Sequence, residues 1–177
     1  DPDAIHAGRQ AILKQVAEAG KDVFAGLYAA TATSGDFSPD ARSAGLRALR
    51  NTALTYLSHA EQTPARARAA FDAANNMTDL SHALTILAHR FPDSAETAEA
   101  LAAFRQRFAE NALVIDKWFA IQAGIPGAKT LDRVRTLMDN PLFKRTNPNR
   151  MRSLVGSFAF SNPTGFICRP SCSQVKT

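Results

Sequence analysis

Cysteine, tryptophan and tyrosine are scarce, since the 177 residues contain only two, one and two of them. Cys168 and Cys172 form a single C-x-x-x-C pair near the end of the chain. Two thiolates are half of the four ligands that a structural zinc ion requires. A disulfide between residues so close in sequence could not cross-link distant parts of a core. The sequence therefore predicts no metal site in this chain and a reduced, cytoplasmic setting.

Long apolar runs are also missing. No stretch of about 18 uninterrupted apolar residues occurs, so we expect no transmembrane helix and no membrane partner. The first residues, Asp1, Pro2 and Asp3, lack both an initiator methionine and the basic and apolar regions of a signal peptide. The sequence is therefore expected to be a processed product or a cut fragment.

None of the common catalytic signatures is present: no H-E-x-x-H zinc motif, no G-x-S-x-G nucleophile turn and no glycine-rich nucleotide loop. The four histidines, His6, His59, His82 and His89, are dispersed. His82 and His89 could share a helical face, but two turns of helix place them about 10 Å apart along the axis, too far to bind one ion. We expect solvated or half-buried histidines and no catalytic centre in this chain.

The composition is that of a globular protein, with 45% hydrophobic and 21% charged residues. Residues 1–128 carry 12 Lys and Arg against 14 Asp and Glu, whereas residues 129–177 carry 9 against 2. A basic segment can attract nucleic acid, an anionic membrane or an anionic peptide group, or simply form a solvated face. No RNP-like segment, zinc-finger spacing or basic zipper accompanies the charge, so nucleic acid is not an expected partner.

Apolar residues recur at helical spacing along almost the whole chain, and no alternating strand pattern is present. The apolar stripes lie at residues 5–16, 23–27, 46–57, 67–74, 80–87, 98–108, 113–121, 131–138 and 151–160. Breakers that contain proline or glycine separate most of these stripes. We predict about nine helices joined by loops of roughly 2 to 8 residues.

The predicted fold is all-α, an irregular antiparallel helical stack of the HEAT-like α-solenoid type. Consecutive helices with short loops pack antiparallel, and a series of such pairs forms a superhelix. No strict repeat length can be written down, so a regular repeat protein is disfavoured and a compact bundle is the alternative.

Three segments combine residue types that often occur at functional sites: residues 47–51 (RALRN), 75–79 (NNMTD) and 116–119 (DKWF). Arg47 and Arg50 lie one turn apart, and Thr78 or Asp79 is expected near a helix cap. Each segment also has a purely structural interpretation in packing or capping. Trp118 lies on an apolar helix face and is expected to be buried.

Together with two later segments, these blocks resemble aminopeptidase N, the bacterial family of zinc-dependent alanyl aminopeptidases. The matching blocks are residues 47–51 (RALRN), 75–79 (NNMTD), 116–123 (DKWFAIQA), 130–137 (TLDRVRTL) and 147–156 (NPNRMRSLVG), continuing through 158–159 and 162–163. They follow the family's order at similar intervals and span most of residues 1–166. One block alone would be a weak signal, but five in order are specific.

The resemblance implies that residues 1–166 are part of the large C-terminal helical domain of such an enzyme. The family's zinc ligands and its G-x-M-E-N exopeptidase motif belong to a separate catalytic domain and are absent here. The implied parent reaction is hydrolysis of the first peptide bond of an oligopeptide, with zinc polarising the carbonyl and activating water. Oligopeptides and the missing catalytic domain are the implied partners, and this chain alone is expected to be inactive.

The implied role of the helical domain is to cover the active site and to line a chamber for short peptides. Within it, Asn149, Arg150 and Arg152 are the candidate substrate-binding residues. A helix N-terminus offers free amides and a positive dipole end, and arginine can bind a carboxylate through two hydrogen bonds. The alternative is that these arginines pin neighbouring helices. If Arg152 faces the chamber, Leu154 should face the core.

The last residues, 167–177 (ICRPSCSQVKT), depart from the family pattern, which normally continues after Phe166 with a histidine and an acidic, glycine-rich segment. A frameshift, a cloning scar and a truncated gene would each account for this aberrant tail. The absent helices would leave an apolar face uncovered, which favours self-association or partner binding. A stand-alone helical protein-interaction module is therefore the alternative function.

Overall fold

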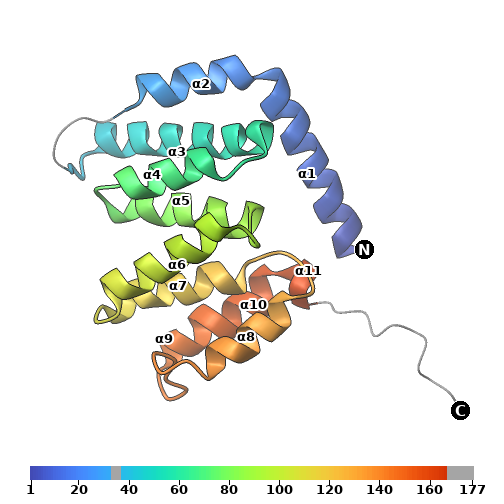
Figure 1. Cartoon of the computed structure of the whole chain (residues 1–177), viewed down its shortest axis with the longest axis vertical. Coiled ribbons are helices and arrows are strands. Elements are labelled where there is room, and N and C mark those ends of the chain that lie inside the picture. Colours follow the sequence, from blue (N-terminus) through green and yellow to red (C-terminus); the bar gives the residue numbers. More distant parts are fainter. Residues whose placement is uncertain (33–36, 167–177) are drawn as a thin grey trace, which may run out of the picture. The chain divides into compact units, whose positions relative to one another are not determined.

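The computed structural model describes residues 1–32 and 37–166, so the tail with Cys168 and Cys172 lies outside the described residues. Helices account for 77% of the described residues, and none of these residues forms a β-strand. The chain divides into two compact units, residues 7–107 and residues 1–6 with 108–177. The predicted all-α fold is confirmed (Figure 1).

The helices of the described residues follow one another with short connections. They are α1 (Pro2–Ala19), α2 (Lys21–Ala30), α3 (Ala41–Glu61), α4 (Ala65–Ala73), α5 (Met77–Arg90), α6 (Ala95–Phe108), α7 (Ala112–Ala123), α8 (Thr130–Met138), α9 (Pro148–Met151), the π-helix η1 (Arg152–Gly156), α10 (Ser157–Ser161) and α11 (Pro163–Phe166).

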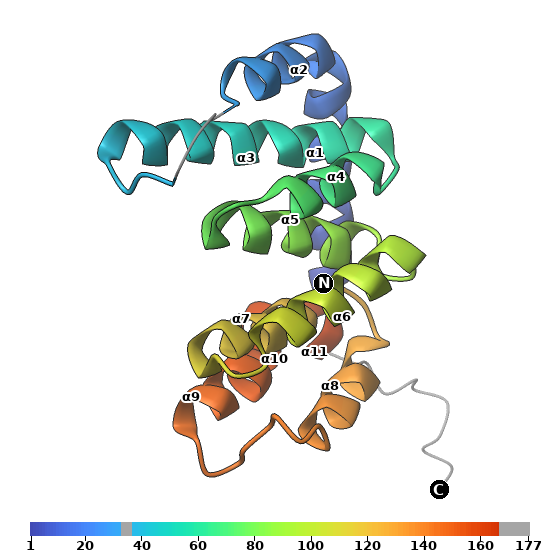
Figure 2. The ribbon, with the colours of Figure 1, turned by 60° about the vertical axis from the view of Figure 1, so that its left-hand side comes forward.

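In the unit of residues 7–107, antiparallel helix pairs are stacked. α2 packs on α3, and α3 in turn contacts α4 and α5. Figure 2 shows α2, α3 and the α4–α5 pair as successive layers. Stacked rings of Phe24 and Tyr56, with centroids 4.4 Å apart, join the first two layers. Leu57, Leu84 and Leu87 are completely buried, which places the core between α3 and α5.

Side-chain caps determine where several of these helices begin. Ser94 Oγ accepts a hydrogen bond from the Thr97 amide at 3.2 Å and thereby caps α6. The cap of α5 is Asn76, whose side chain accepts from the Asp79 amide at 3.0 Å. Thr78 and Asp79 follow this cap by two and three residues, which confirms the prediction that they lie near a helix cap.

The other unit contains α7, α8 and the helices of residues 148–166. Ile115, Phe119 and Leu154 are completely buried, and Trp118 is 5% exposed. The predicted burial of Trp118 and of Leu154 is confirmed. Asn162 joins the end of the unit to α7, because its Nδ2 donates to the carbonyl oxygens of Ala123 at 2.9 Å and of Ile125 at 2.7 Å.

One feature of this unit is not foreseen by the periodicity. α9, η1 and α10 follow one another without a break, and the middle of this continuous helix has π-helical hydrogen bonds over Arg152–Gly156. Counted as one helix, it brings the helices of the described residues to ten, close to the predicted nine. The additional one is the single turn α11, which starts at Pro163, a residue suited to a first helical turn.

The apolar stripe of α1 is exposed, whereas the apolar stripes of α3 and α5 are buried. Ile12 is 63% exposed and Val16 is 44% exposed, although their spacing matches the buried faces of α3 and α5. Helical periodicity therefore locates this helix correctly without indicating whether another helix covers its apolar side.

Candidate functional site

The segment with the sequence-predicted site residues begins a helix. Asn147 is the N-cap of α9, and its Oδ1 accepts from the amides of Asn149 at 2.9 Å and Arg150 at 3.3 Å. Pro148 follows at the first helical position, where its missing N–H removes one further donor. Amides that the sequence suggested as free for a substrate are thus already satisfied, and any ligand binding at this segment depends on its side chains.

Arg150 points into the unit. It is 5% exposed, and its Nη1 lies 3.1 Å from Oδ1 of Asp116 on α7. Its guanidinium carbon lies 5.2 Å from the centre of the Phe119 ring, within the range of a cation–π contact. Ser153 also donates to Asp116, over 3.3 Å. Arg150 therefore holds α9 against α7, as the structural alternative stated.

Asn149 and Arg152 are exposed instead. Arg152 is the first residue of the π-helical turn, two positions before the fully buried Leu154. π-helical turns are rare and frequently lie at functional sites, because they displace side chains from the regular helical positions. The structure thus gives the predicted segment one buried and two exposed polar residues.

In the unit of residues 7–107, the structure brings together two segments singled out in the sequence. Nδ2 of Asn51 donates to Oδ1 of Asp79 at 2.8 Å, which links α3 to the first turn of α5. Oδ2 of the same carboxylate accepts from Nδ2 of Asn76 at 2.7 Å. Nε2 of His82 lies 2.9 Å from the Asn51 carbonyl oxygen. These contacts make residues 51 and 79 part of one polar network.

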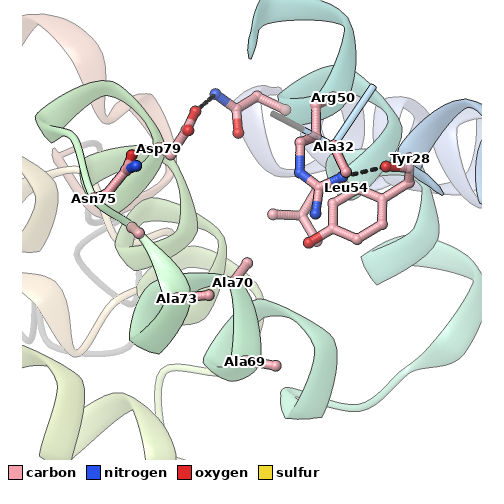
Figure 3. Close-up of a pocket in the computed structure, with 11 residues that line it drawn as sticks. Tyr28, Ala32, Arg50, Leu54, Ala69, Ala70, Ala73, Asn75 and Asp79 are labelled. Atoms are coloured by element: carbon pink, nitrogen blue, oxygen red, sulfur yellow. Dashed lines mark hydrogen bonds between the residues drawn. The ribbon is translucent and has the colours of Figure 1, made fainter. Parts of the chain in front are cut away.

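A pocket of about 340 Å³ opens beside this network. In Figure 3, Asp79 and Asn75 lie on one side, Tyr28 and Arg50 on the opposite side, and alanines of α4 along the lower wall. The lining residues come from α2, α3, α4, α5 and the adjoining loops: Tyr28, Ala32, Arg50, Asn51, Leu54, Ala69, Ala70, Ala73, Ala74, Asn75 and Asp79.

Arg50 is half-buried at this pocket and held in place by Tyr28. Its Nη1 donates to the carbonyl oxygen of Tyr28, and its guanidinium carbon lies 3.8 Å from the centre of that ring. Within the described residues, no carboxylate forms an ion pair with Arg50. Its positive charge is therefore oriented but not neutralised.

A different basic group is buried between α3 and α5. His59 is 3% exposed, and its Nδ1 has no hydrogen-bond partner among the described residues. Burial, together with the positive charge of Arg90, lowers the pKa of His59 from 6.5 to about 4. Burial also lowers the pKa of Arg90. Neither residue lines the pocket described above.

Across residues 1–32 and 37–166, no three His, Cys, Asp or Glu side chains come together as possible metal ligands. In the same part of the chain, no helix combines the length and the apolarity needed to cross a membrane. The histidines His59 and His82 are instead engaged in helix packing, the latter through Thr55 Oγ1 at 2.9 Å.

Sequence reasoning missed most of the pocket lining, including Tyr28, Leu54 and the alanines of α4. Tyr28 follows an apolar stripe that suggested packing only. Arg50 and Asn51 were noted for their spacing, and Asp79 for its place near a cap. No local signal could relate residue 28 to residues 50 and 79, because only the packing of three helices brings them together.

A stack of antiparallel helix pairs defines an α-helical repeat protein. The family described as "Domain of unknown function (DUF3458_C) ARM repeats" matches residues 1–169, and the chain belongs to it.

The similar proteins are aminopeptidases. The chain is 39% identical over 166 residues to aminopeptidase N of Haemophilus influenzae, 40% over 169 residues to that of Caulobacter vibrioides and 36% over 169 residues to that of Escherichia coli. Each alignment covers 94% of this chain and 19% of the relative, so the chain spans about a fifth of their length. The resemblance to aminopeptidase N is confirmed.

A solved structure shows the same fold. It is a crystal structure of Legionella pneumophila aminopeptidase A in complex with aspartic acid, which is 31% identical and aligns with a TM-score of 0.82. The alignment covers 94% of this chain and 20% of that chain. The helical arrangement of this chain therefore occurs as one part of a larger aminopeptidase.

Proposed function

We propose that this chain is a fragment of a zinc-dependent aminopeptidase that removes N-terminal residues from peptides. In the parent enzyme, it covers the active site and lines the substrate chamber without supplying catalytic residues. The observation that carries the proposal is the 36–40% identity to three aminopeptidases N over 94% of this chain. Zinc would be held by the catalytic domain of the parent enzyme, where it would polarise the scissile carbonyl and activate water.

The segment from Asn149 to Arg152 is proposed as a wall of that chamber. Asn149 and Arg152 are exposed and can reach a peptide, whereas the buried Arg150 fixes the segment through Asp116. Arginine suits the C-terminal carboxylate of a peptide because its planar guanidinium can donate two parallel hydrogen bonds. Arg152 is thus proposed to bind the substrate, and Arg150 to position the wall.

Kinetics of the full-length parent enzyme test this role. Arg152→Ala should raise KM for peptides of three or more residues by about tenfold or more, since a charged hydrogen bond contributes roughly 1.5–3 kcal/mol. A single-residue alanyl amide should be almost unaffected, because it does not reach this wall. Arg135→Ala, an exposed arginine on α8, is the matched control and should change neither KM. Equal effects on both substrates would reject the chamber role.

The isolated chain should be inactive, and an assay of the chain alone tests this part of the proposal. A variant with Cys168→Ser and Cys172→Ser is expected to bind no stoichiometric zinc and to cleave no alanyl substrate above a heat-treated blank. Elemental analysis and an amide-release assay measure both. One equivalent of zinc, or genuine turnover, would contradict the fragment hypothesis.

The alternative is a stand-alone helical interaction module. The exposed apolar residues of α1, Ile5 at 73% and Ile12 at 63%, are the observation in its favour. The reading frame upstream of Asp1 distinguishes the two: a metalloprotease sequence there supports the aminopeptidase fragment. The cytoplasmic setting is part of the proposal, and cell fractionation of the parent protein tests it.

A further inference from the structure

We propose that the pocket between α2, α3, α4 and α5 binds a small zwitterion, such as a free amino acid or a dipeptide. Its carboxylate would be bound by Arg50 and its ammonium group by Asp79. This inference rests on the residues of the pocket alone and does not depend on the aminopeptidase proposal.

Arg50 provides the proposed binding site for the carboxylate of the ligand. One nitrogen of its guanidinium donates to the Tyr28 carbonyl oxygen, and the guanidinium carbon lies over the Tyr28 ring, 3.8 Å from its centre. These two contacts hold the plane of the guanidinium but leave its other N–H groups without a protein acceptor among the described residues. An oriented arginine with unused donors on a pocket wall is suited to a carboxylate, which it can bind through two hydrogen bonds.

Asp79 provides the proposed binding site for the ammonium group of the ligand. Its two oxygens accept one hydrogen bond each from the amides of Asn51 and Asn76, at 2.8 and 2.7 Å. A carboxylate can accept about four hydrogen bonds, so both oxygens retain acceptor capacity. Within the described part of the chain, neither lysine nor arginine forms an ion pair with Asp79. The negative charge is fixed in position and not neutralised by a cation.

The two charges line the same pocket without pairing with each other. Arg50 and Asp79 lie on opposite sides of it in Figure 3. A molecule with only one charge would satisfy one of them and leave the other facing the pocket. A zwitterion can place its carboxylate at Arg50 and its ammonium group at Asp79. Charge complementarity therefore makes the pocket selective for zwitterions over ligands with a single charge.

The remaining walls limit the size and polarity of the ligand. Leu54 is 1% exposed and forms an apolar surface, and the facing side of α4 presents Ala70 and Ala73. The volume of about 340 Å³ is at the lower end of the range for small-molecule sites. Alanine side chains leave space for a ligand with small apolar groups, so a short compound such as alanyl-alanine fits the chemistry of the pocket.

The test is a titration of the ¹⁵N-labelled 177-residue chain with L-alanyl-L-alanine and, separately, L-alanine, followed by NMR. We expect saturable shifts confined to the amides around Tyr28, Arg50 and Asp79, with a Kd on the order of 1 mM for at least one of the two compounds. N-acetyl-L-alanyl-L-alanine lacks the ammonium group and L-alanyl-L-alaninamide lacks the carboxylate. Each should bind at least about fivefold more weakly than the dipeptide.

Two alanines of α4 provide a matched pair of variants. Ala73→Leu fills the pocket without removing a polar group and should weaken binding about tenfold or more. Ala65→Leu makes the same change at an exposed position outside the pocket lining and should leave Kd unchanged. A third variant, Asp79→Asn, should lose the preference for the dipeptide over its N-acetyl derivative.

Three outcomes would overturn the inference. They are the absence of shifts at about 20 mM of either zwitterion, equal affinity for the dipeptide and its N-acetyl derivative, and unchanged binding in Ala73→Leu. If Asp79→Asn fails to fold, the blocked dipeptides and the two alanine variants still decide the question, because they leave the Asn51–Asp79 hydrogen bond intact.

Discussion

Arg150 and Arg50 occupy similar settings in different units of the chain, and yet their surroundings imply different roles. Each guanidinium lies over an aromatic ring, Phe119 in one case and Tyr28 in the other. Arg150 is 5% exposed and paired with Asp116, whereas Arg50 is half-buried at a pocket and bonded to a backbone carbonyl. A buried arginine with a carboxylate partner holds helices together, whereas one with only a neutral partner remains available to an anion.

The largest effect on stability is expected at the buried pair. Arg150→Met leaves the carboxylate of Asp116, whose side chain is 16% exposed, without its cation. Removing one partner of a buried pair costs about 3–5 kcal/mol, so Tm should fall by about 10 °C. Differential scanning calorimetry of the 177-residue chain measures this change.

Two further variants test whether the loss of stability comes from the unpaired carboxylate of Asp116. Arg152 lies two positions after Arg150 and is exposed. Arg152→Met should therefore change the free energy of unfolding by less than about 0.5 kcal/mol. The double variant Arg150→Met with Asp116→Asn should recover part of the loss, because no uncompensated charge remains. A single variant as stable as the parent chain would show that Arg150 does not hold α9 against α7.

His59 is a buried basic group that forms no ion pair with an acidic side chain within the described residues and does not line the pocket described above. Because its pKa falls from 6.5 unfolded to about 4 folded, the unfolded state binds the proton first as pH decreases. Stability should be complete above pH 6.5 and decrease between pH 6.5 and 4, by about 3 kcal/mol in total. Burial lowers the pKa of His82 as well, which acts in the same direction.

Urea unfolding at several pH values measures this dependence. His59→Gln should flatten the slope between pH 6.5 and 4. Ser58→Ala, at the neighbouring buried position, removes a 2.7 Å hydrogen bond to Thr55 but no titratable group, so it should lower stability and keep the slope. An unchanged slope in His59→Gln would mean that other groups cause the acid sensitivity.

The smallest effect is expected at Arg50. Arg50→Ala removes a hydrogen bond to Tyr28 and a half-exposed cation–π contact, which together contribute about 1–2 kcal/mol. Tm should fall by only a few degrees in calorimetry. A loss as large as that of Arg150→Met would assign Arg50 a structural role and remove the contrast between the two arginines.

The sequence predicted the helices well where breakers and caps mark their ends. Helix α7 lies where the apolar stripe of residues 113–121 predicts it, and its apolar face buries Trp118. Periodicity and capping are local properties that a short window of sequence contains. The exposed stripe of α1 shows the limit of this reasoning, because the burial of Ile12 depends on what packs against the helix.

The candidate sites depend on tertiary contacts more than the positions of the helices do. The resemblance drew attention to residues 147–156, but only the structure shows that Arg150 turns inward to Asp116 while Arg152 turns outward. The pocket required Tyr28, Arg50 and Asp79 to meet through the packing of α2, α3 and α5. Residues so far apart in sequence produce no shared local pattern.

The π-helical turn Arg152–Gly156 has a consequence for deletions in the gene. A π-turn accommodates one residue more than the regular α-helical ladder, and each residue rotates a helix by about 100°. Losing a single codon within this turn would remove that extra residue, so the helix could close as a regular one while its two halves keep their rotational phase. Arg150 would stay against Asp116, and Phe158, now 6% exposed, would still face the core. A second lost codon has no such reserve and would rotate Phe158 by about 100° out of the core.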